Sequence, residues 1–351
     1  YPEGLFVMSG ISELRQDLVT GDWVVVATGR ARRPHEFAKH RIAEKPQPRA
    51  SCPFERLLPG ALLVYDRKGA TPHGTRGNAS ARQDRWWVQV LPNKYPAFSP
   101  SDSCPIPRPV GPYHWQEGVG FHEVVVTRHH TRALGAMTGE EVGVVLRAYR
   151  DRYLALRGEP CVRYVSIFEN HGRAAGATIS HPHSQIIAIP VIPPDVERSL
   201  RGSAAYFKKR RSCVHCTMMA FERRQGWRVV YENKACLVFC PYVSRQAFEV
   251  RIFPKRHQPA FESVSEDELH ATADALQAAL AKLNRGLGDP AYNFFIHTAP
   301  TTGSTAASYY HWHIEIIPKT AVWAGFEIGT GIEISTSSPE AAAQFLRKIN
   351  A

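Results

Sequence analysis

An internal repeat restricts the folds open to this chain more than any other feature of its sequence. A strand-like run, Glu-Val-Val-Val or Glu-Val-Arg-Ile, leads to a histidine in each half, His130 and His257. Each histidine precedes a hydroxyl residue by eight positions and a phenylalanine by 38. A cysteine motif opens each half and a His-x-His motif follows; the matched positions are Cys52 and Cys213, Thr138 and Ser265, Phe168 and Phe295, His181-Pro-His183 and His311-Trp-His313. Matched features in one order predict an internal duplication.

Apolar runs flanked by turn residues predict a chain built mostly from short strands. The predicted strands cover residues 23–27, 86–91, 123–127, 164–168, 185–189, 236–239, 248–253, 293–297 and 312–317. Two capping boxes, Thr138 with Glu141 and Ser265 with Glu268, each begin a segment with apolar residues at helical spacing. The predicted helices cover 138–158, 191–211, 265–286 and 339–349, and the predicted loops 29–85 and 93–118. This pattern predicts an α+β fold with mainly antiparallel pairing.

Charge and hydropathy limit the ligands and the location of the chain. Of its 351 residues, 43 are Lys or Arg and 32 are Asp or Glu, which gives a net charge of +11. This balance favours an anionic ligand or simply a basic surface, and the run from Lys208 to Arg211 is typical of a solvated helix end. No run approaches the roughly 20 apolar residues of a membrane helix, and residues 1–10 lack the pattern of a signal peptide. We therefore expect no membrane partner and interpret residues 1–10 as a loose leader.

Cysteine usage favours thiols and metal binding over a disulfide framework. The chain has seven cysteines, an odd number, and Cys213 and Cys216 form a Cys-x-x-Cys pair. Such a pair is typical of a zinc grip, and free thiols persist in reducing compartments. The sequence therefore predicts a cytoplasmic protein.

The densest polar motif is Ser180-His-Pro-His-Ser-Gln-Ile-Ile187, which follows Asn170-His-Gly172. Alternation along a strand places His181, His183 and Gln185 on one face. An exposed polar ladder would explain the three residues alone, whereas the companion residues around them favour a ligand site.

The order of these motifs resembles that of the galactose-1-phosphate uridylyltransferases and their relatives in the histidine-triad superfamily. His181-Pro-His183-Ser-Gln185 is similar to their His-Pro-His-Gly/Ser-Gln signature. Other similar segments lie between roughly residues 12 and 350: Thr20-Gly-Asp-Trp23, Arg30-Ala-Arg-Arg33-Pro34, Cys52-Pro-Phe54, Pro92-Asn93-Lys-Tyr-Pro96, Phe168-Glu-Asn170-His-Gly172, Pro254-Lys-Arg-His257 and His311-Trp-His313.

The resemblance implies a duplicated histidine-triad fold, in which two pseudo-symmetric halves share a mainly antiparallel sheet with flanking helices. Residues 11–190 would form the N-terminal half with the His-Pro-His-Ser-Gln motif. Residues 191–351 would form the C-terminal half with a Cys₂His₂ zinc site. The resemblance also implies a homodimer, with Arg30 or Arg33 near a shared active site.

The resemblance assigns roles to single residues. His183 is expected to be the nucleophile that carries a nucleoside monophosphate, because imidazole attacks well near neutral pH and also leaves well. Gln185 would hydrogen-bond the non-bridging phosphate oxygens, where charge builds up. The other expected substrate-binding residues, for the diphosphate and the nucleotide, are Arg30, Arg33, Asn93, Asn170, Thr178 and Ser184.

Two zinc sites are expected from the repeat and the resemblance together. The second-half ligands would be Cys213, Cys216, His257 and His311, a Cys₂His₂ set, although a free thiol pair with two unrelated histidines is the alternative. The first-half ligands would be Cys52, Glu55, His130 and His181. Relatives typically have Cys where Glu55 stands, so this site either takes a carboxylate ligand or is weak or empty. The neighbouring His129 and His215 are alternative ligands.

The expected reaction moves a nucleoside monophosphate, UMP as first choice, from a nucleotide sugar to a hexose 1-phosphate. The region after His313 departs from the well-known uridylyltransferases, since Ala321 and Glu333 stand where these present Lys and Gln to the sugar phosphate. The alternative is an ADP-sugar or other nucleotide-sugar phosphorylase with inorganic phosphate as acceptor. A non-catalytic module that binds nucleotides or RNA would leave His183 and Gln185 unexplained, so we expect no nucleic-acid partner.

Overall fold

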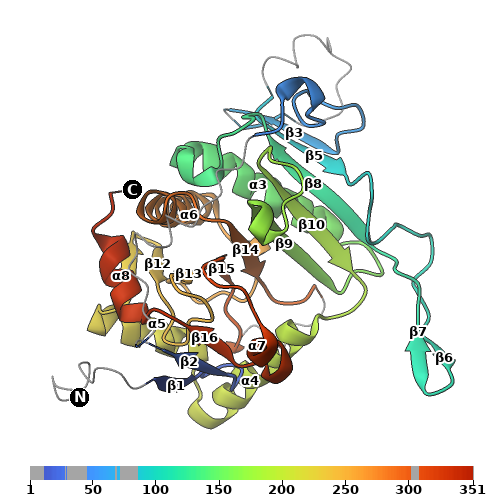
Figure 1. Cartoon of the computed structure of the whole chain (residues 1–351). Coiled ribbons are helices and arrows are strands. Elements are labelled where there is room, and N and C mark those ends of the chain that lie inside the picture. The colour runs from blue at the N-terminus through green and yellow to red at the C-terminus, as the bar shows by residue number, and fades with distance from the viewer. Residues whose placement is uncertain are drawn as a thin grey trace.

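An eleven-stranded sheet forms the centre of the computed structural model, which describes residues 12–27, 29, 46–67, 69–71, 86–301 and 308–350 (Figure 1). All neighbouring strands in this sheet are antiparallel. From one edge to the other they are β11 (Val229–Glu232), β12 (Cys236–Phe239), β13 (Val250–Pro254), β15 (His313–Pro318), β14 (Tyr292–His297), β9 (Tyr164–His171), β10 (His183–Ile189), β8 (Phe121–Thr127), β5 (Val88–Pro92), β3 (Leu63–Asp66) and β4 (Gly69–Thr71). The predicted α+β class with antiparallel pairing is confirmed.

The strand order is the same on both sides of the junction between β9 and β14. Outward from β9 the order is β10, β8, β5 and β3, and outward from β14 it is β15, β13, β12 and β11. Phe168 on β9 lies directly opposite Phe295 on β14. The two phenylalanines that hold matched positions in the sequence repeat therefore meet at the centre of the sheet.

Two long helices cover one face of the sheet. α3 (Gly139–Leu156) and α6 (Glu266–Leu287) pack against each other, and their buried side chains join the sheet residues in one large apolar core (Figure 1). Both predicted capping boxes are present, with Thr138 and Ser265 as the capping residues. Alternation along β10 turns Ile186 and Ala188 into this core, so His183 and Gln185 lie on the opposite face.

The other face of the sheet carries smaller elements. α5 (Val214–Gln225) packs there through Met219, which contacts Leu237, Phe239 and Phe253. α4 (Pro194–Arg210) confirms the helix predicted between the halves. α8 (Pro339–Arg347) confirms the one predicted at the end, and it packs against α6 on the helix-covered side. A second sheet combines β1 (Glu13–Gln16), β2 (Trp23–Val26) and β16 (Glu333–Ser335), with the short helix α7 (Gly325–Thr330) before β16.

The segments predicted as loops contain more structure than expected. The prediction for 29–85 and 93–118 is corrected by strands β3 and β4 and by β6 (Arg108–Val110) and β7 (Tyr113–Trp115). The β6–β7 hairpin projects from the body, so its residues face solvent and lack the apolar alternation that marks a strand in the sequence (Figure 1). A disulfide joins Cys104 to Cys161, which the odd cysteine count had not suggested, and the other five cysteines are not disulfide-bonded.

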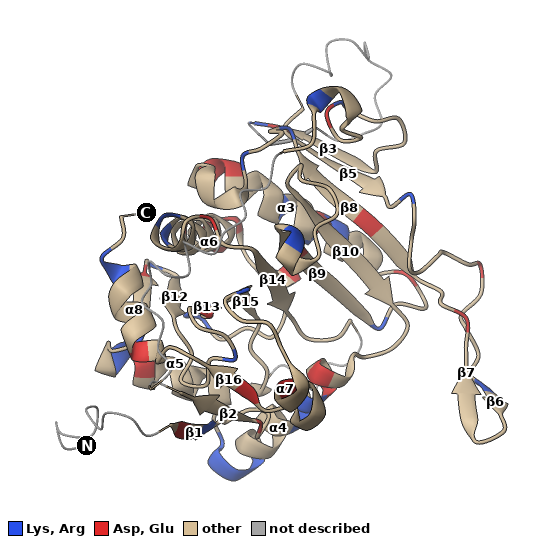
Figure 2. Cartoon of the chain, in the orientation of Figure 1, with Lys and Arg blue, Asp and Glu red and all other residues tan. Residues whose placement is uncertain are grey.

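The charges are spread over many elements. Figure 2 shows Lys and Arg on strands, helices and loops throughout the described chain, with Asp and Glu among them. The run predicted to be a solvated helix end lies at the C-terminal end of α4, where Lys208, Lys209 and Arg210 complement the helix dipole. Among the helices of the described residues, none is long and apolar enough to cross a membrane.

The capping box of α6 also holds the loop that carries His257. Glu268 accepts hydrogen bonds from Arg256 at 2.5 and 2.8 Å and from the backbone amide of Ser265 at 2.9 Å. The bond from Arg256 lowers the pKa of Glu268 from its ordinary value of 4.5 to about 2. A lowered carboxyl pKa contributes stability that is fully present above pH 4.5 and is lost as the pH falls through about 2.

We therefore expect Glu268→Gln to lower the free energy of unfolding at pH 7 by ~1 kcal/mol, the usual scale for a partly exposed pair and a helix cap. The difference from the unmodified protein should shrink as the pH approaches 2. Urea unfolding followed by circular dichroism across this pH range measures it. Asp267→Asn, which changes an exposed acid in the same turn, is the control. An equal loss of stability in this control would contradict a stabilising ion pair between Glu268 and Arg256. An effect of Glu268→Gln that does not change with pH would contradict it as well.

Candidate active site and metal clusters

His183 is the first residue of β10, and its geometry fixes its tautomer. Its Nδ1 lies 2.8 Å from the carbonyl oxygen of His181, which can only accept a hydrogen bond. Nδ1 therefore carries the proton, and Nε2 keeps a lone pair. Burial lowers the pKa of His183 below its ordinary value of 6.5, and the ring of Phe54 packs at 5.3 Å between centroids. The result is a neutral, oriented imidazole of the kind that can act as a nucleophile.

Gln185, two residues along the same strand face, is oriented by a histidine that sequence reasoning missed. The backbone amide of Ala97 donates to Nδ1 of His122 at 3.1 Å, so Nε2 of His122 bears its proton. This Nε2 donates to Oε1 of Gln185 at 2.8 Å, so Nδ2 of Asn93, 3.0 Å away, is a neighbouring donor and not its hydrogen-bond partner. Because the Gln185 oxygen accepts from His122, its NH₂ group is left to donate to a ligand.

Asn170, near the end of β9, is oriented in the same way from the other half of the chain. Asn293 on β14 donates to Oδ1 of Asn170 at 2.8 Å and to the carbonyl of Ala175 at 2.9 Å. The NH₂ group of Asn170 therefore also remains a donor. Two amide donors beside a neutral imidazole suit an anionic ligand, since donors without positive charge can stabilise phosphate oxygens at short range.

The loop after β9 shapes this side of the site. Gly172 has φ +77°, and a Cβ there would lie 2.9 Å from the side chain of Ala291. Glycine is therefore required at this turn. The loop leads through η4 (Arg173–Ala175) to the exposed Thr178, one of the predicted substrate residues.

The structure does not bring every predicted residue to this face. Ser184 is buried on the helix-covered side, where its hydroxyl contacts the Tyr149 hydroxyl and donates to Glu169 at 3.1 Å. Strand alternation explains this placement, since neighbours of His183 must point the other way. Arg30 and Arg33 lie outside the described residues.

A metal-ligand cluster lies behind His183. Ligand atoms of Cys52, Glu55, His130 and His181 all lie within 4.8 Å of one another. The cluster includes Sγ of Cys52 3.4 Å from Nδ1 of His181, and Oε2 of Glu55 2.9 Å from Nδ1 of His130. These last two atoms are buried without a hydrogen-bond partner, which a shared cation would supply. The cluster thus fits zinc with one carboxylate ligand.

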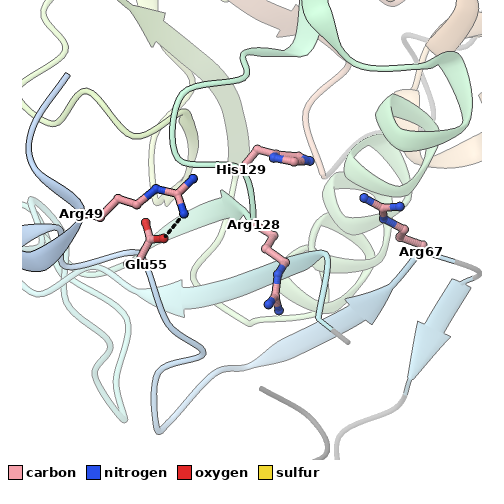
Figure 3. Close-up of a pocket in the computed structure, with 5 residues that line it drawn as sticks. All are labelled: Arg49, Glu55, Arg67, Arg128 and His129. Atoms are coloured by element: carbon pink, nitrogen blue, oxygen red, sulfur yellow. Dashed lines mark ion pairs between the residues drawn. The ribbon is translucent and has the colours of Figure 1, made fainter. Parts of the chain in front are cut away.

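His129 takes no part in this cluster and faces a cationic cavity beside it. The cavity, of about 240 Å³, is lined by Arg49, Glu55, Arg67, Arg128 and His129 (Figure 3). Arg49 lies 3.5 Å from Glu55, the only carboxylate among these residues. Of the two adjacent histidines, the structure therefore places His130 among the metal-ligand candidates and His129 outside them.

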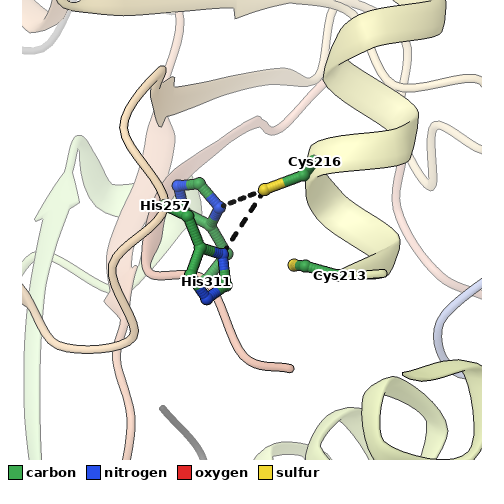
Figure 4. A group of neighbouring side chains, drawn as sticks. All are labelled: Cys213, Cys216, His257 and His311. Atoms are coloured by element: carbon green, nitrogen blue, oxygen red, sulfur yellow. Dashed lines mark hydrogen bonds between the residues drawn. The ribbon is translucent and has the colours of Figure 1, made fainter. Parts of the chain in front are cut away.

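The second cluster combines Cys213, Cys216, His257 and His311, as predicted (Figure 4). Sγ of Cys216 lies 3.4 Å from Nδ1 of both histidines. Zinc bonds of 2.3 Å to sulfur and 2.0–2.1 Å to nitrogen in a tetrahedron require a separation of ~3.6 Å between such atoms. The hydrogen bond with Cys216 lowers the pKa of Cys213 to about 3, so a thiolate is favoured in the pair. The donor set and its spacing fit a structural zinc ion.

Each cluster is held by the same pair of backbone contacts. Nε2 of His181 lies 2.7 Å from the carbonyl of Thr127 at the end of β8, and Nε2 of His311 lies 2.9 Å from that of Pro254 at the end of β13. These bonds leave Nδ1 of both rings to face the thiols, as outer hydrogen bonds do in metal sites. His215 does not join the cluster.

A neutral imidazole beside two amide donors is an arrangement that can transfer a phosphorus-containing group. Comparisons with known proteins specify the class. Residues 6–193 match the family model described as galactose-1-phosphate uridyl transferase, N-terminal domain, and residues 119–349 match a domain family of unknown function.

Two curated relatives align over almost the whole chain. The ADP-glucose phosphorylase of Arabidopsis thaliana is 31% identical over 96% of this chain and 93% of its own length. The galactose-1-phosphate uridylyltransferase of Thermotoga maritima is 28% identical over 96% of this chain and 98% of its own length.

Solved structures agree with this assignment. A crystal structure of an ADP-glucose phosphorylase from Arabidopsis thaliana with bound ADP-glucose superposes with a TM-score of 0.77, at 28% identity, over 97% of this chain and 99% of that one. A uridylyltransferase structure superposes with a TM-score of 0.70, at 27% identity, over 96% and 98%. The chain therefore belongs to the galactose-1-phosphate uridylyltransferase family and is a nucleotidyltransferase, as its motifs had indicated.

Proposed function

We propose that this chain moves a nucleoside monophosphate from a nucleotide sugar to a phosphate-bearing acceptor through a covalent intermediate on His183. The observation that carries this proposal is the hydrogen bond from Nδ1 of His183 to the His181 carbonyl. It aims a neutral ring with a free Nε2 lone pair at the face where Gln185 and Asn170 present amide donors.

The proposed reaction has two displacements. In the first, Nε2 of His183 attacks the α-phosphorus of the nucleotide sugar; the N–P bond forms as the bond to the bridging oxygen breaks, and the sugar 1-phosphate leaves. In the second, an acceptor phosphate oxygen attacks the same phosphorus and His183 leaves as neutral imidazole. The NH₂ groups of Gln185 and Asn170 would stabilise the charge on the non-bridging oxygens in both steps. Arg30, Arg33, Asn93 and Thr178 stay predicted substrate residues.

We favour inorganic phosphate as the acceptor and an ADP-sugar as the donor. The support is the ADP-glucose phosphorylase relative, at 31% identity, together with the residues after β15. Where well-known uridylyltransferases hold a sugar phosphate with Lys and Gln, this chain has Ala321 and Glu333. Glu333 lies on β16, in the cavity that also contains Arg245, and its carboxylate lacks the NH₂ donor that Gln would offer to a sugar phosphate.

The second candidate is transfer of UMP to a hexose 1-phosphate. Its support is the 28% identity to the Thermotoga maritima uridylyltransferase over nearly the full length of both chains. Both candidates share the covalent half-reaction, so they differ only in the base and the acceptor.

The proposal includes a duplicated histidine-triad fold with halves at 11–190 and 191–351, for which the repeated strand order is the support. A homodimer and a cytoplasmic location stay predictions. Zinc is the proposed ion for both clusters. In the second cluster the four protein ligands would close the coordination sphere, so this ion would stabilise the fold without taking part in the reaction. In the first, a bound ion would hold His181 and thereby the start of β10.

His183→Asn should abolish exchange, by at least ~10³-fold, because the first displacement loses its nucleophile. The unmodified protein, incubated with ADP-glucose or UDP-glucose without acceptor, should gain the mass of one nucleotidyl group in intact mass spectrometry. His114→Asn, an exposed histidine on β7, is the control and should keep both activity and adduct. Near-normal turnover by His183→Asn would refute the assignment.

The adduct also identifies the base, and its decay identifies the acceptor. We expect faster turnover of ADP-glucose with phosphate than of UDP-glucose with galactose 1-phosphate, measured as initial rates at equal concentrations. The reverse order would favour the second candidate while leaving the His183 chemistry intact.

Cys213→Ser/Cys216→Ser should remove about one zinc ion per chain and lower the melting temperature, because a closed tetrahedral site contributes its binding energy to folding. Elemental analysis and thermal unfolding measure the two effects. Cys240→Ala, which removes a buried thiol outside both clusters, should keep the zinc. Unchanged zinc content in the double variant would contradict the site.

A further inference from the structure

The second half contains a counterpart of the His183 site with different chemistry. On β10 and β9, Gln185 lies opposite Phe168; on β15 and β14, Glu315 lies opposite Phe295. Two residues before Glu315 stands His313, which lies opposite His297. His313 thus matches His183, Glu315 matches Gln185, and His297 matches Asn170. Both sets lie on the face of the sheet that is opposite α3 and α6.

The second half has different residue types at the positions that match Gln185 and Asn170, so it suits a different kind of ligand. In the first half the two amides donate hydrogen bonds, which suits phosphate. In the second half an imidazole and a carboxylate replace them while the central histidine is kept. Two imidazoles and one carboxylate form the ligand set that binds divalent transition metals with open positions for water. Both replacements therefore favour the binding of a cation.

The three side chains already converge. Their ligand atoms all lie within 4.8 Å of one another, with Nε2 of His297 3.2 Å from Oε2 of Glu315. The rings of His297 and His313 stack at 4.7 Å between centroids. Nδ1 of His313 lies 3.1 Å from the His311 carbonyl, so its Nε2 carries a lone pair, as in His183.

Charged groups from several elements surround the three side chains. Arg245 and Arg251 form ion pairs with Glu315 and Glu249. Two further carboxylates face these guanidinium groups: Asp17, 4.0 Å from Arg251, and Glu333, which shares a cavity with Arg245. Arg251 also lies 3.6 Å from Glu315, and burial raises the pKa of both Glu249 and Glu333, so the charge count alone does not select a cation. Asp22, just before β2, and Asp195 on α4 both pair with Arg198.

A cavity and an unpartnered histidine lie at the same place. The cavity has a volume of about 90 Å³ and is lined by His215, His297, His313 and Glu315, with Arg251. This volume has room for an ion together with water ligands. His215 is only 2% exposed, yet both of its ring nitrogens are without a hydrogen-bond partner. The ion pairs explain Glu315 but leave His215 unexplained, whereas a metal-bound water could bond to it.

We propose that His297, His313 and Glu315 bind a divalent transition-metal ion, separate from the two cysteine-containing clusters. Water completes the coordination sphere on the side of His215. The ion links β14 to β15. This site does not depend on the activity proposed above.

Cobalt(II) is the probe, because thiolate ligands give it near-ultraviolet charge-transfer bands that imidazole and carboxylate ligands do not give. Chelator-treated full-length protein is reloaded with Co²⁺, and bound cobalt is counted by elemental analysis after gel filtration. His297→Asn, which restores the residue type of Asn170, should lose about one ion per chain. The thiolate bands should stay unchanged. His270→Asn, an exposed histidine on α6, is the control and should keep the full cobalt content.

Equal cobalt content in His297→Asn and the unmodified protein would overturn the proposal. A second measurement covers the case in which the variant fails to fold. Crystals of the unmodified protein loaded with Co²⁺ should show an anomalous peak beside His297, His313 and Glu315. A map with peaks only at the cysteine clusters would overturn the proposal as well.

Discussion

The pairing of β9 with β14 is the constraint on which the rest of the structure depends. It joins the two halves in one sheet and sets Asn293 opposite Asn170, so that one half orients a ligand-facing amide of the other. On the helix-covered side, Tyr292 of β14 donates to the buried carboxylate of Glu169 at 3.2 Å, and Ser184 donates to it at 3.1 Å. Burial raises the pKa of Glu169. A one-residue slip would exchange these faces and lose both the site and the network.

Backbone carbonyls, more than side chains, decide what each histidine does. In both His-x-His motifs the first ring bonds a carbonyl through Nε2 and turns Nδ1 to the cysteines. The second ring bonds a carbonyl through Nδ1 and keeps the lone pair on Nε2. The two histidines of each motif therefore have fixed and opposite tautomers, which suits the metal ligand and the nucleophile proposed for the first half. The proposed zinc ion in the first half would hold His181. Because His181 lies only two residues before His183, the ion would also help to fix the position of His183.

Features that repeat or alternate along the chain could be predicted from the sequence. Features that depend on residues far apart in the sequence could not. The capping boxes and the buried strands follow from local pattern, and the cluster at Cys213 follows from the spacing of the repeat. Strands β3, β4, β6 and β7 were missed because Pro, Gly and Arg dominate their segments. His122 was missed because only the register of β8 against β10 places it beside Gln185. Ser184 was expected at the ligand although alternation already placed it on the far side of His183.

The ligands proposed for the two halves are opposite in charge although the backbone arrangement is shared. Register holds His183 and His313 at equivalent points, and each leaves an Nε2 lone pair at the sheet face. The neighbouring residues then decide whether an anion or a cation can bind beside this lone pair. Amides whose oxygens are already occupied offer only N–H groups, so Gln185 and Asn170 favour an anion. Glu315 and His297 offer lone pairs instead, and the arginines around Glu315 are matched by further carboxylates. An anion at the site proposed in the second half would meet those carboxylates, and a cation beside His183 would meet amide hydrogens, so each of these two places would disfavour the ligand proposed for the other.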